Sequence, residues 1–242
     1  MEAEEQVVPS VWTRPHRARR EQPSLSRAQI VTEALRLLDS DGLDALSMRK
    51  LGTRLNAGAT SMYTHVANKD ELIELVVDEV YGEMDVVPPS GPEGWREAAA
   101  ECAHRLRSVI LRHPWMVSVL GEVGLAHLGP NLMRMSEGLL GLFEEAGFTL
   151  DEANQAAQTL VSYVTGKATS EAALLVTLAR GDQDERQWRK QVRPAAERAA
   201  RPYPRLRRLY AAQREEDTGT AREDGFDYGL ARILDGLQTR LV

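Results

Sequence analysis

A short segment after the sequence Asn56–Gly58 concentrates hydroxyl, phenol and imidazole side chains. These are Thr60, Ser61, Tyr63, Thr64 and His65, interleaved with the apolar residues Met62 and Val66. Met62 and Val66 are one helical turn apart, so both can face a core while the polar side chains cover the other faces. Thr and Ser hydroxyls can hydrogen-bond to base edges or phosphates, and a Thr methyl can contact a thymine methyl. The pattern favours a surface that contacts DNA.

Two cationic residues flank this segment and extend the predicted surface. Arg49 has the planar fork that matches O6 and N7 of guanine. Lys69 stands at the start of a predicted helix, where free backbone N–H groups already favour a phosphate. Tyr63 and His65 are long enough to reach phosphates on either flank. The alternative is that these side chains only solvate a small helical bundle, because many helix-turn-helix sequences are packing units.

The elements that position these groups are predicted to be four helices within residues 25–87, the fourth of which links to the rest of the chain. Three of the four predicted starts have a side chain that can cap a helix, namely Ser26, Ser47 and Asn68. Gly42 is expected to end the first helix in a left-handed conformation. Asn56–Gly58 supplies a tight turn between the second and third helices, because Asn and Gly tolerate positive φ. This arrangement is typical of a helix-turn-helix module.

The charge of the chain is distributed unevenly. The net charge is −6, yet residues 11–70 hold ten Lys or Arg against six Asp or Glu, so this segment is +4 and the remainder is −10. Such asymmetry suggests a basic binding module joined to an acidic body, although chance clustering on solvated faces gives the same numbers. Residues 1–24 are predicted to be a mobile basic tail. Its run Arg14–Arg20 either enters a minor groove or binds phosphate without specificity.

Composition limits the other classes of function. At 242 residues with 43% hydrophobic content, the chain can bury a large core, and its few aromatic residues favour helices over strands. A single cysteine, Cys102, excludes a disulfide framework or a cysteine metal cluster, and the five histidines show no metal-ligand spacing. No signal peptide or long apolar run is present, so a soluble cytoplasmic protein is expected. No catalytic or cofactor-binding motif is found, so no cofactor is expected and an enzyme is disfavoured.

Residues 88–242 are predicted to form a second, larger helical domain, so the fold class is all-α. Pro88–Pro92 breaks the helical pattern and marks the boundary. Helices are expected over 95–111, 115–126 and 132–146, then from Thr149 to about Ala179, followed by a shorter helix between Arg180 and Gly225 and a mobile stretch over 214–224. Two faces suit pairing of subunits: the alanines of the long helix and the apolar stripe of the last helix, from Phe226 to Leu241. Alternatively, both faces are buried within one subunit.

Residues 25–72 resemble the DNA-binding domain of the TetR family of bacterial transcriptional repressors. The resemblance is carried by "EALRLLDSDGLDALSMRKLGTRL" (Glu33–Leu55) and by "SMYTHVANKDEL" (Ser61–Leu72). It implies that Arg49, Thr60 and Ser61 lie toward bases, and that the DNA backbone is held by Tyr63, His65 and Lys69. Ala59 and Met48 occupy positions that carry polar base contacts in the tetracycline repressor, so the operator of that protein is not expected here.

The remaining chain is similar to the C-terminal domain of the tetracycline-repressor type. The carrying residues are "HLGPN" (His127–Asn131) and "LFEEAGFTLDEANQAAQTLVSYVTG" (Leu142–Gly166). The resemblance implies a helical ligand chamber and a dimer formed through the long and final helices. Candidate effector-binding residues combine apolar side chains with a few polar groups; they are His104, His113, Trp115, Met116, His127, Asn131, Met133, Phe143, Gln158 and Tyr163. His127 is the best single candidate because its "HLG" run resembles one that holds a ligand-contacting histidine.

These observations predict a homodimeric repressor that reads a palindromic operator in double-stranded DNA and is released by a small-molecule effector. Such release requires that the effector favour a dimer geometry that spaces the recognition helices wrongly. A helical adaptor that binds another protein is the alternative. That adaptor would show no salt-dependent DNA affinity, and it would be indifferent to Arg49→Ala or Tyr63→Ala.

Overall fold

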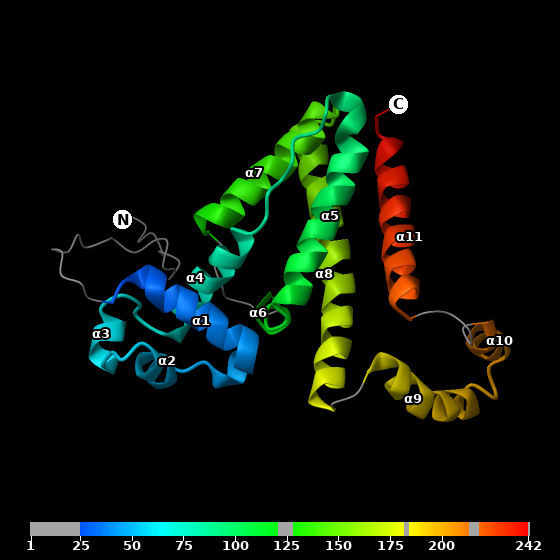
Figure 1. Cartoon of the computed structure of the whole chain (residues 1–242). Coiled ribbons are helices and arrows are strands. Elements are labelled where there is room, and N and C mark those ends of the chain that lie inside the picture. Colours follow the sequence, from blue (N-terminus) through cyan, green and yellow to red (C-terminus); the bar gives the residue numbers. More distant parts are fainter. Residues whose placement is uncertain (1–24, 121–127, 182–183, 213–217, 242) are drawn as a thin grey trace, which may run out of the picture.

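A computed structural model describes residues 25–120, 128–181, 184–212 and 218–241, and its helices and connections confirm the all-α prediction (Figure 1). The predicted tail at 1–24 and His127 lie outside these residues. In chain order the elements are α1 (Arg27–Asp41), η1 (Leu43–Ala45), α2 (Met48–Arg54), α3 (Ala59–Tyr63), α4 (Lys69–Tyr81), η2 (Pro92–Gly94), α5 (Trp95–Arg112), α6 (Met116–Leu120), α7 (Pro130–Glu145), α8 (Leu150–Arg180), α9 (Glu185–Ala199), α10 (Pro204–Ala212) and α11 (Thr218–Gln238).

The N-terminal module, α1 to α4, begins its helices at the predicted caps. The Ser26 side chain accepts a hydrogen bond from the backbone of Gln29, whose own side chain returns to the backbone of Ser26. The side chains of Ser47 and Asn68 cap α2 and α4 by accepting hydrogen bonds from the backbone N–H groups of Lys50 and Glu71. Each such cap satisfies a backbone N–H that no helical carbonyl can reach. Local sequence therefore determines where these helices start.

The core of the module joins all four helices. Its fully buried side chains include Ile30 and Leu37 of α1, Leu51 of α2 and Met62 of α3. α1 packs against both α2 and α4, and α2 packs against α3. Burying a side chain of this size contributes about 1.5–3 kcal/mol. The short α3, which is too short to be stable by itself, thus owes its position to this core.

The rest of the chain forms the body, in which α5, α7 and α8 pack together and α11 lies along α5 and α8 (Figure 1). At one end, Trp95, Phe143 and Phe148 form an aromatic cluster with ring centroids 5.7–6.0 Å apart. Five alanines of α8 face inward, whereas Ala173 is exposed; the five buried ones are Ala153, Ala156, Ala157, Ala168 and Ala172. Within a single subunit these alanines already let α5 and α7 approach α8 closely, so they do not by themselves indicate pairing of subunits.

Two expectations about the C-terminal third were wrong. In place of one shorter helix, residues 184–212 contain two, α9 and α10, which are joined by a turn before Pro204. The last helix begins at Thr218, so most of the stretch expected to be mobile over 214–224 is helical. The sequence "REEDTGTARED" is polar and lacks an apolar stripe, and its residues 214–217 lie outside the described part of the chain. Residues 218–224 extend α11 N-terminally from its buried residue Phe226, and they contain no proline to end the helix. None of the described helices is long and apolar enough to cross a membrane.

Candidate nucleic-acid interface and the contacts beneath it

The turn before α3 depends on two residues that accept unusual geometry. Asn56 has φ 48°, in the left-handed region that Asn tolerates better than most residues. The backbone N–H of Ala57 donates a hydrogen bond of 2.8 Å to the carbonyl oxygen of Gly52. A Cβ at Gly52 would lie only 2.8 Å from the carbonyl oxygen of Ala57, so the close approach of the turn to α2 requires glycine. The sequence predicted the role of Asn56 but not that of Gly52.

The polar residues that follow this turn lie on the surface, as their spacing predicts. Met62 and Val66 are completely buried, whereas Thr60, Ser61, Tyr63 and Thr64 are exposed. α3 ends at Tyr63, one turn earlier than the continuous helix that the apolar spacing suggested. The Thr64 hydroxyl donates to the carbonyl oxygen of Ser61 at 2.6 Å, a local bond that competes with helix continuation.

His65 follows α3 in the connection to α4 and is half-buried. Its carbonyl oxygen accepts a hydrogen bond of 3.3 Å from Nε of Arg27. This bond links the connection between α3 and α4 to the start of α1. The structure therefore places Thr60, Ser61, Tyr63 and Thr64 together on the exposed side of α3, with His65 at its edge.

Arg49 differs from its cationic neighbours Lys50 and Arg54, because no acidic partner is found for it among the described residues. Lys50 is within 2.6 Å of a carboxylate oxygen of Asp41, and this hydrogen bond lowers the pKa of the Asp41 carboxyl. Arg54 pairs with Glu33 at 3.2 Å. Within the described part of the chain, no carboxylate lies within ion-pair distance of the exposed Arg49. The guanidinium of Arg49 is thus available to an external anion or base.

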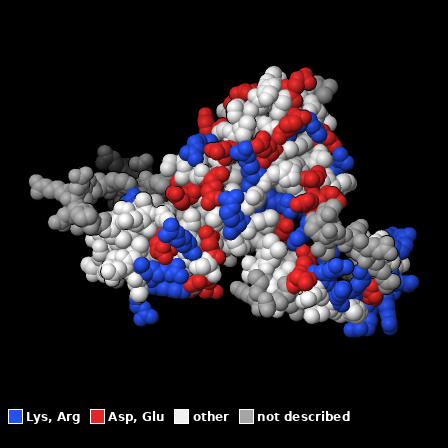
Figure 2. Space-filling model, in the orientation of Figure 1, with Lys and Arg blue, Asp and Glu red and all other residues white. Residues whose placement is uncertain are grey.

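Lys69 is the first residue of α4 and directly follows the Asn68 cap. It is half-buried, and no ion pair to it is found among the described residues. Figure 2 shows Lys and Arg gathered over the lower part of the N-terminal module and over α9 and α10, while acidic residues cover much of the upper body. Of the segment 11–70, the described residues 25–70 hold six Lys or Arg against five Asp or Glu. Most of the predicted excess of positive charge therefore belongs to the tail, which lies outside the described residues, and a second basic region lies over α9 and α10.

The module is held to the body by carboxylates at two places. On α4, the buried Asp78 accepts hydrogen bonds from the backbone N–H groups of Asn131 (3.0 Å) and Leu132 (3.1 Å). Asp78 thereby caps α7, whose own N-cap residue, Gly129, has no side chain to do so. A Cβ on Gly129 would lie 2.0 Å from Oδ1 of Asp78, so glycine is needed for this approach.

The second place joins α1 to the turn between α5 and α6. Oδ1 of Asp39 accepts a hydrogen bond of 2.8 Å from Nε1 of Trp115 and lies 2.7 Å from Nδ1 of His113. The other ring nitrogen of His113 lies 3.0 Å from Oε1 of Glu83, a residue just beyond α4. His113 and Trp115 are only 3% and 5% exposed, whereas the side chains of Asp39 and Glu83 are 35% and 29% exposed, so these polar contacts lie at the edge of the buried region.

The predicted effector residues do not gather in one place. His113, Trp115 and Asn131 contact the N-terminal module, as described above. His104 and Tyr163 both pack on the Phe226 ring, at centroid distances of 5.1 Å and 5.5 Å. The remaining described candidates occupy separate positions: Phe143 and Met116 are buried, Met133 is exposed, and Gln158 is exposed on α8.

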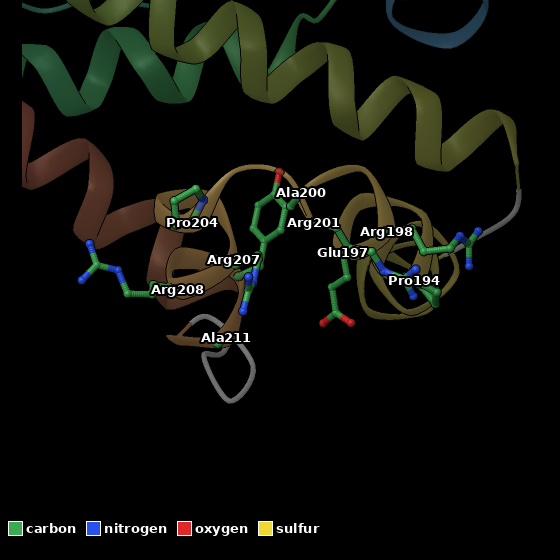
Figure 3. Close-up of a pocket in the computed structure, with 10 residues that line it drawn as sticks. Pro194, Glu197, Arg198, Ala200, Arg201, Pro204, Arg207, Arg208 and Ala211 are labelled. Atoms are coloured by element: carbon green, nitrogen blue, oxygen red, sulfur yellow. The ribbon is translucent and has the colours of Figure 1, made fainter.

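An open pocket of about 700 Å³ lies between α9 and α10, and none of the predicted effector residues lines it. Its lining includes Arg198, Arg201, Arg207 and Arg208. Figure 3 shows Arg198 and Arg208 on opposite sides of the pocket rather than converging on one point. The pocket is therefore a basic surface hollow and not an enclosed ligand chamber.

Comparison with known proteins decides the family. Residues 30–76 match the sequence model described as bacterial regulatory proteins, tetR family, and residues 87–241 match that of the tetracyclin repressor-like C-terminal domain. The second match alone covers more than half of the chain. This protein belongs to the TetR family.

Relatives and solved structures of the TetR family align with most of this chain. An HTH-type transcriptional regulator of Saccharopolyspora erythraea is 39% identical over 163 residues, which are 67% of this chain and 68% of the relative. The HTH-type transcriptional repressor DrrR1 of Streptomyces coeruleorubidus is 34% identical over 89% of this chain and 78% of its own length. The crystal structure of the Streptomyces coelicolor TetR family protein ActR in complex with actinorhodin aligns with a TM-score of 0.72 and 32% identity, covering 90% and 98% of the two chains. This TetR family member is a ligand-responsive, DNA-binding transcriptional repressor, as its sequence predicted.

Proposed function

We propose that two copies of this chain form a homodimer that reads a palindromic operator through the exposed side of α3. In this proposal residues 25–87 bind DNA, and residues 88–242 bind the effector and the second subunit. The observation that carries it is the exposed face formed by Thr60, Ser61 and Tyr63, which a buried core holds in place. The same module contains Arg49, for which no acidic partner is found among the described residues. A recognition helix of this kind lies in the major groove with its first residues at base edges. Being a DNA-bound regulator, the protein is expected to act in the cytoplasm.

Specific roles follow from where the side chains lie. Arg49, Thr60 and Ser61 are proposed to contact bases, with Ala59 close to them at the start of α3. Side chains at the edges of the surface, namely Tyr63, Thr64, His65 and Lys69, are proposed to contact phosphates. Lys69 has the additional support of its position, because the N-terminus of α4 offers backbone N–H groups and a favourable dipole to a phosphate.

The effector is proposed to bind within the body and to release the operator. This part is supported by the ActR complex with actinorhodin, which shows a TetR family relative holding a small molecule. His104 and Tyr163, which share contacts with Phe226 from α5 and α8, are proposed to contact the effector, as is His127. The buried Met116 and Phe143 are proposed as apolar lining, and the exposed Gln158 as a residue at the rim.

A selection from random DNA duplexes tests the operator proposal. The wild-type protein is expected to enrich one palindromic sequence. Thr60→Ala is expected to relax the preference at one or two positions of each half-site, because a lost base contact costs about 1–3 kcal/mol of discrimination. The matched control is Thr32→Ala, which removes the same side chain from the exposed side of α1. Enrichment of no sequence by the wild type would contradict direct reading of DNA and would favour the helical adaptor.

The selected duplex then serves as the probe for effector release. Actinorhodin is the first compound to add, since it is the ligand of the structurally similar ActR. Release of the labelled duplex in proportion to the compound, and loss of that release in Tyr163→Phe with DNA affinity unchanged, would support the effector site. If a triple variant with Tyr163→Phe, His104→Ala and His127→Ala releases the duplex as the wild type does, the proposed effector site is contradicted.

A further inference from the structure

Beside the apolar core that they share, the N-terminal module and the body are joined by polar contacts along two routes that use different helices. Helix α4 is the covalent connection, and its Asp78 adds a contact to α7. The second route starts from Asp39 in the last turn of α1 and reaches His113 and Trp115, which are 74 and 76 residues away in sequence. This route does not pass through α4. A displacement of the turn between α5 and α6 can therefore reach α1 directly.

The polar cluster at the second route is built to fix an orientation. One oxygen of Asp39 meets both the indole N–H of Trp115 and Nδ1 of His113. Glu83 occupies the other side of the His113 ring and also pairs with Arg112. Hydrogen bonds of this kind are directional, and a buried polar group left without its partner is costly. An apolar contact would hold the two parts together, but it would tolerate sliding and rotation that this cluster does not.

Contacts inside the module carry the orientation of α1 to the DNA-contacting side. α1 packs against α2, and α2 packs against α3. Met62, which positions α3, belongs to the same core as Leu37, two residues before Asp39. The module is thus a packed unit in which α1 and α3 turn together, because a close-packed core transmits displacement rather than absorbing it.

We propose that His113 and Trp115 are positioning residues that hold α1, and with it the exposed side of α3, at a fixed orientation relative to the body through Asp39. The inference rests on the proposed function, because orientation matters to DNA binding only if two copies of α3 must enter successive major grooves together. Breaking the Asp39 contacts frees the module to sample orientations in which one copy of α3 is out of register. The apparent affinity for the operator is then lowered in proportion to the fraction of time that the dimer spends out of register.

Two variants break the contacts in different ways. Asp39→Ala removes the acceptor of both hydrogen bonds. Trp115→Phe removes only the N–H and keeps a ring in the buried position. It therefore tests the role of the Asp39 contacts even if Asp39→Ala does not fold. The matched control is Asp44→Ala, which removes a carboxylate from an exposed position of the same module. Thermal unfolding of each variant separates loss of orientation from loss of folding.

The first readout needs no DNA. Spin labels are attached to the exposed Thr32→Cys on α1, in a Cys102→Ser background, and the distance between the labels of the two subunits is measured by double electron–electron resonance. The wild type and Asp44→Ala are expected to give one narrow distance distribution. Asp39→Ala and Trp115→Phe are expected to give a clearly broader one. Distributions as narrow as the control in both variants would overturn the proposal.

The second readout is affinity for the selected duplex, measured at constant salt. Asp39→Ala and Trp115→Phe are expected to bind about fivefold or more weakly, within the range of coupling between sites in regulated proteins, and Asp44→Ala to bind as the wild type does. Wild-type affinity in both folded variants would overturn the proposal. If the wild type selects no duplex at all, the proposed function fails, while the label distances still test whether Asp39 orients the module.

Discussion

Lys and Arg gather at two places on the face that Figure 2 shows, namely over the lower part of the N-terminal module and over α9 and α10. Only the first of these places is organised to present its cations. Residues 185–212 contain nine Lys or Arg and only two Glu, so this segment is more basic than the module. Charge alone would therefore have pointed to α9 and α10 as the site that binds DNA.

Both regions pair some of their cations with acids, namely Lys50 and Arg54 in the module and Arg189 and Arg193 in α9. The difference between the regions lies in packing, because buried side chains hold each of the helices α1 to α4 of the module. In α9 and α10 no residue of either helix is buried. Arg198 and Arg208 lie on opposite sides of their pocket (Figure 3). A nucleic-acid interface thus requires cations that are fixed relative to one another, and their number is a weaker indicator.

The largest expected difference between the two regions is in stability. Met62→Ala should lower the free energy of unfolding by about 2–5 kcal/mol, because it leaves a cavity in a fully packed core. Leu206→Ala on α10, where the side chain is 40% exposed, should change it by about 0.5 kcal/mol or less. Urea unfolding at a single protein concentration measures both. Equal losses would show that α10 is packed as firmly as α3.

A smaller effect is expected at the turn before α3. Gly52→Ala should lower the free energy of unfolding by about 1–3 kcal/mol, because its new Cβ meets the carbonyl oxygen of Ala57 at 2.8 Å. Gly58→Ala, in the same turn, is the control, since a Cβ there meets nothing within 4 Å and its φ is −68°. If both variants unfold alike, the close approach of the turn to α2 is not what fixes α3.

How far the sequence predicts this structure depends on how local the determining contacts are. Ser26, Ser47 and Asn68 cap their helices as predicted, and so does Thr149 at the start of α8, because a cap and its partner lie three residues apart. The burial of Met62 and Val66 also followed from spacing alone. The exposed polar side of α3, the main part of the proposed DNA site, could thus be predicted.

Contacts between distant residues could not be predicted in this way. Asp39 and Trp115 are 76 residues apart, and the sequence around Asp39 is that of an ordinary exposed helix end. Asp78 had a signal, since a carboxylate inside the apolar run of α4 needs a buried partner, but nothing in the sequence identified α7 as that partner. His113, Trp115 and Asn131 were singled out for their chemistry, and their contacts with the module became visible only in three dimensions.

The next prediction compares how steeply the affinity for DNA depends on salt in variants of the two regions. Lys69→Ala should reduce the slope of log affinity against log salt concentration by about one unit, because one phosphate contact is lost. Arg208→Ala on α10 removes a cation from the more basic region and should leave the slope unchanged. Fluorescence anisotropy of a labelled operator between about 50 and 200 mM salt measures both. A shallower slope for Arg208→Ala would mean that α10 contacts DNA after all.

The most direct test of the central claim compares the two regions on one duplex. Affinities of wild type, Arg49→Ala and Arg207→Ala are measured for the selected operator and for a scrambled duplex of the same length. The account predicts that Arg49→Ala loses about 1–3 kcal/mol on the operator and little on the scrambled duplex, so that specificity falls. Arg207→Ala should match the wild type on both. Specificity that survives Arg49→Ala but falls with Arg207→Ala would contradict the claim that the module reads the operator.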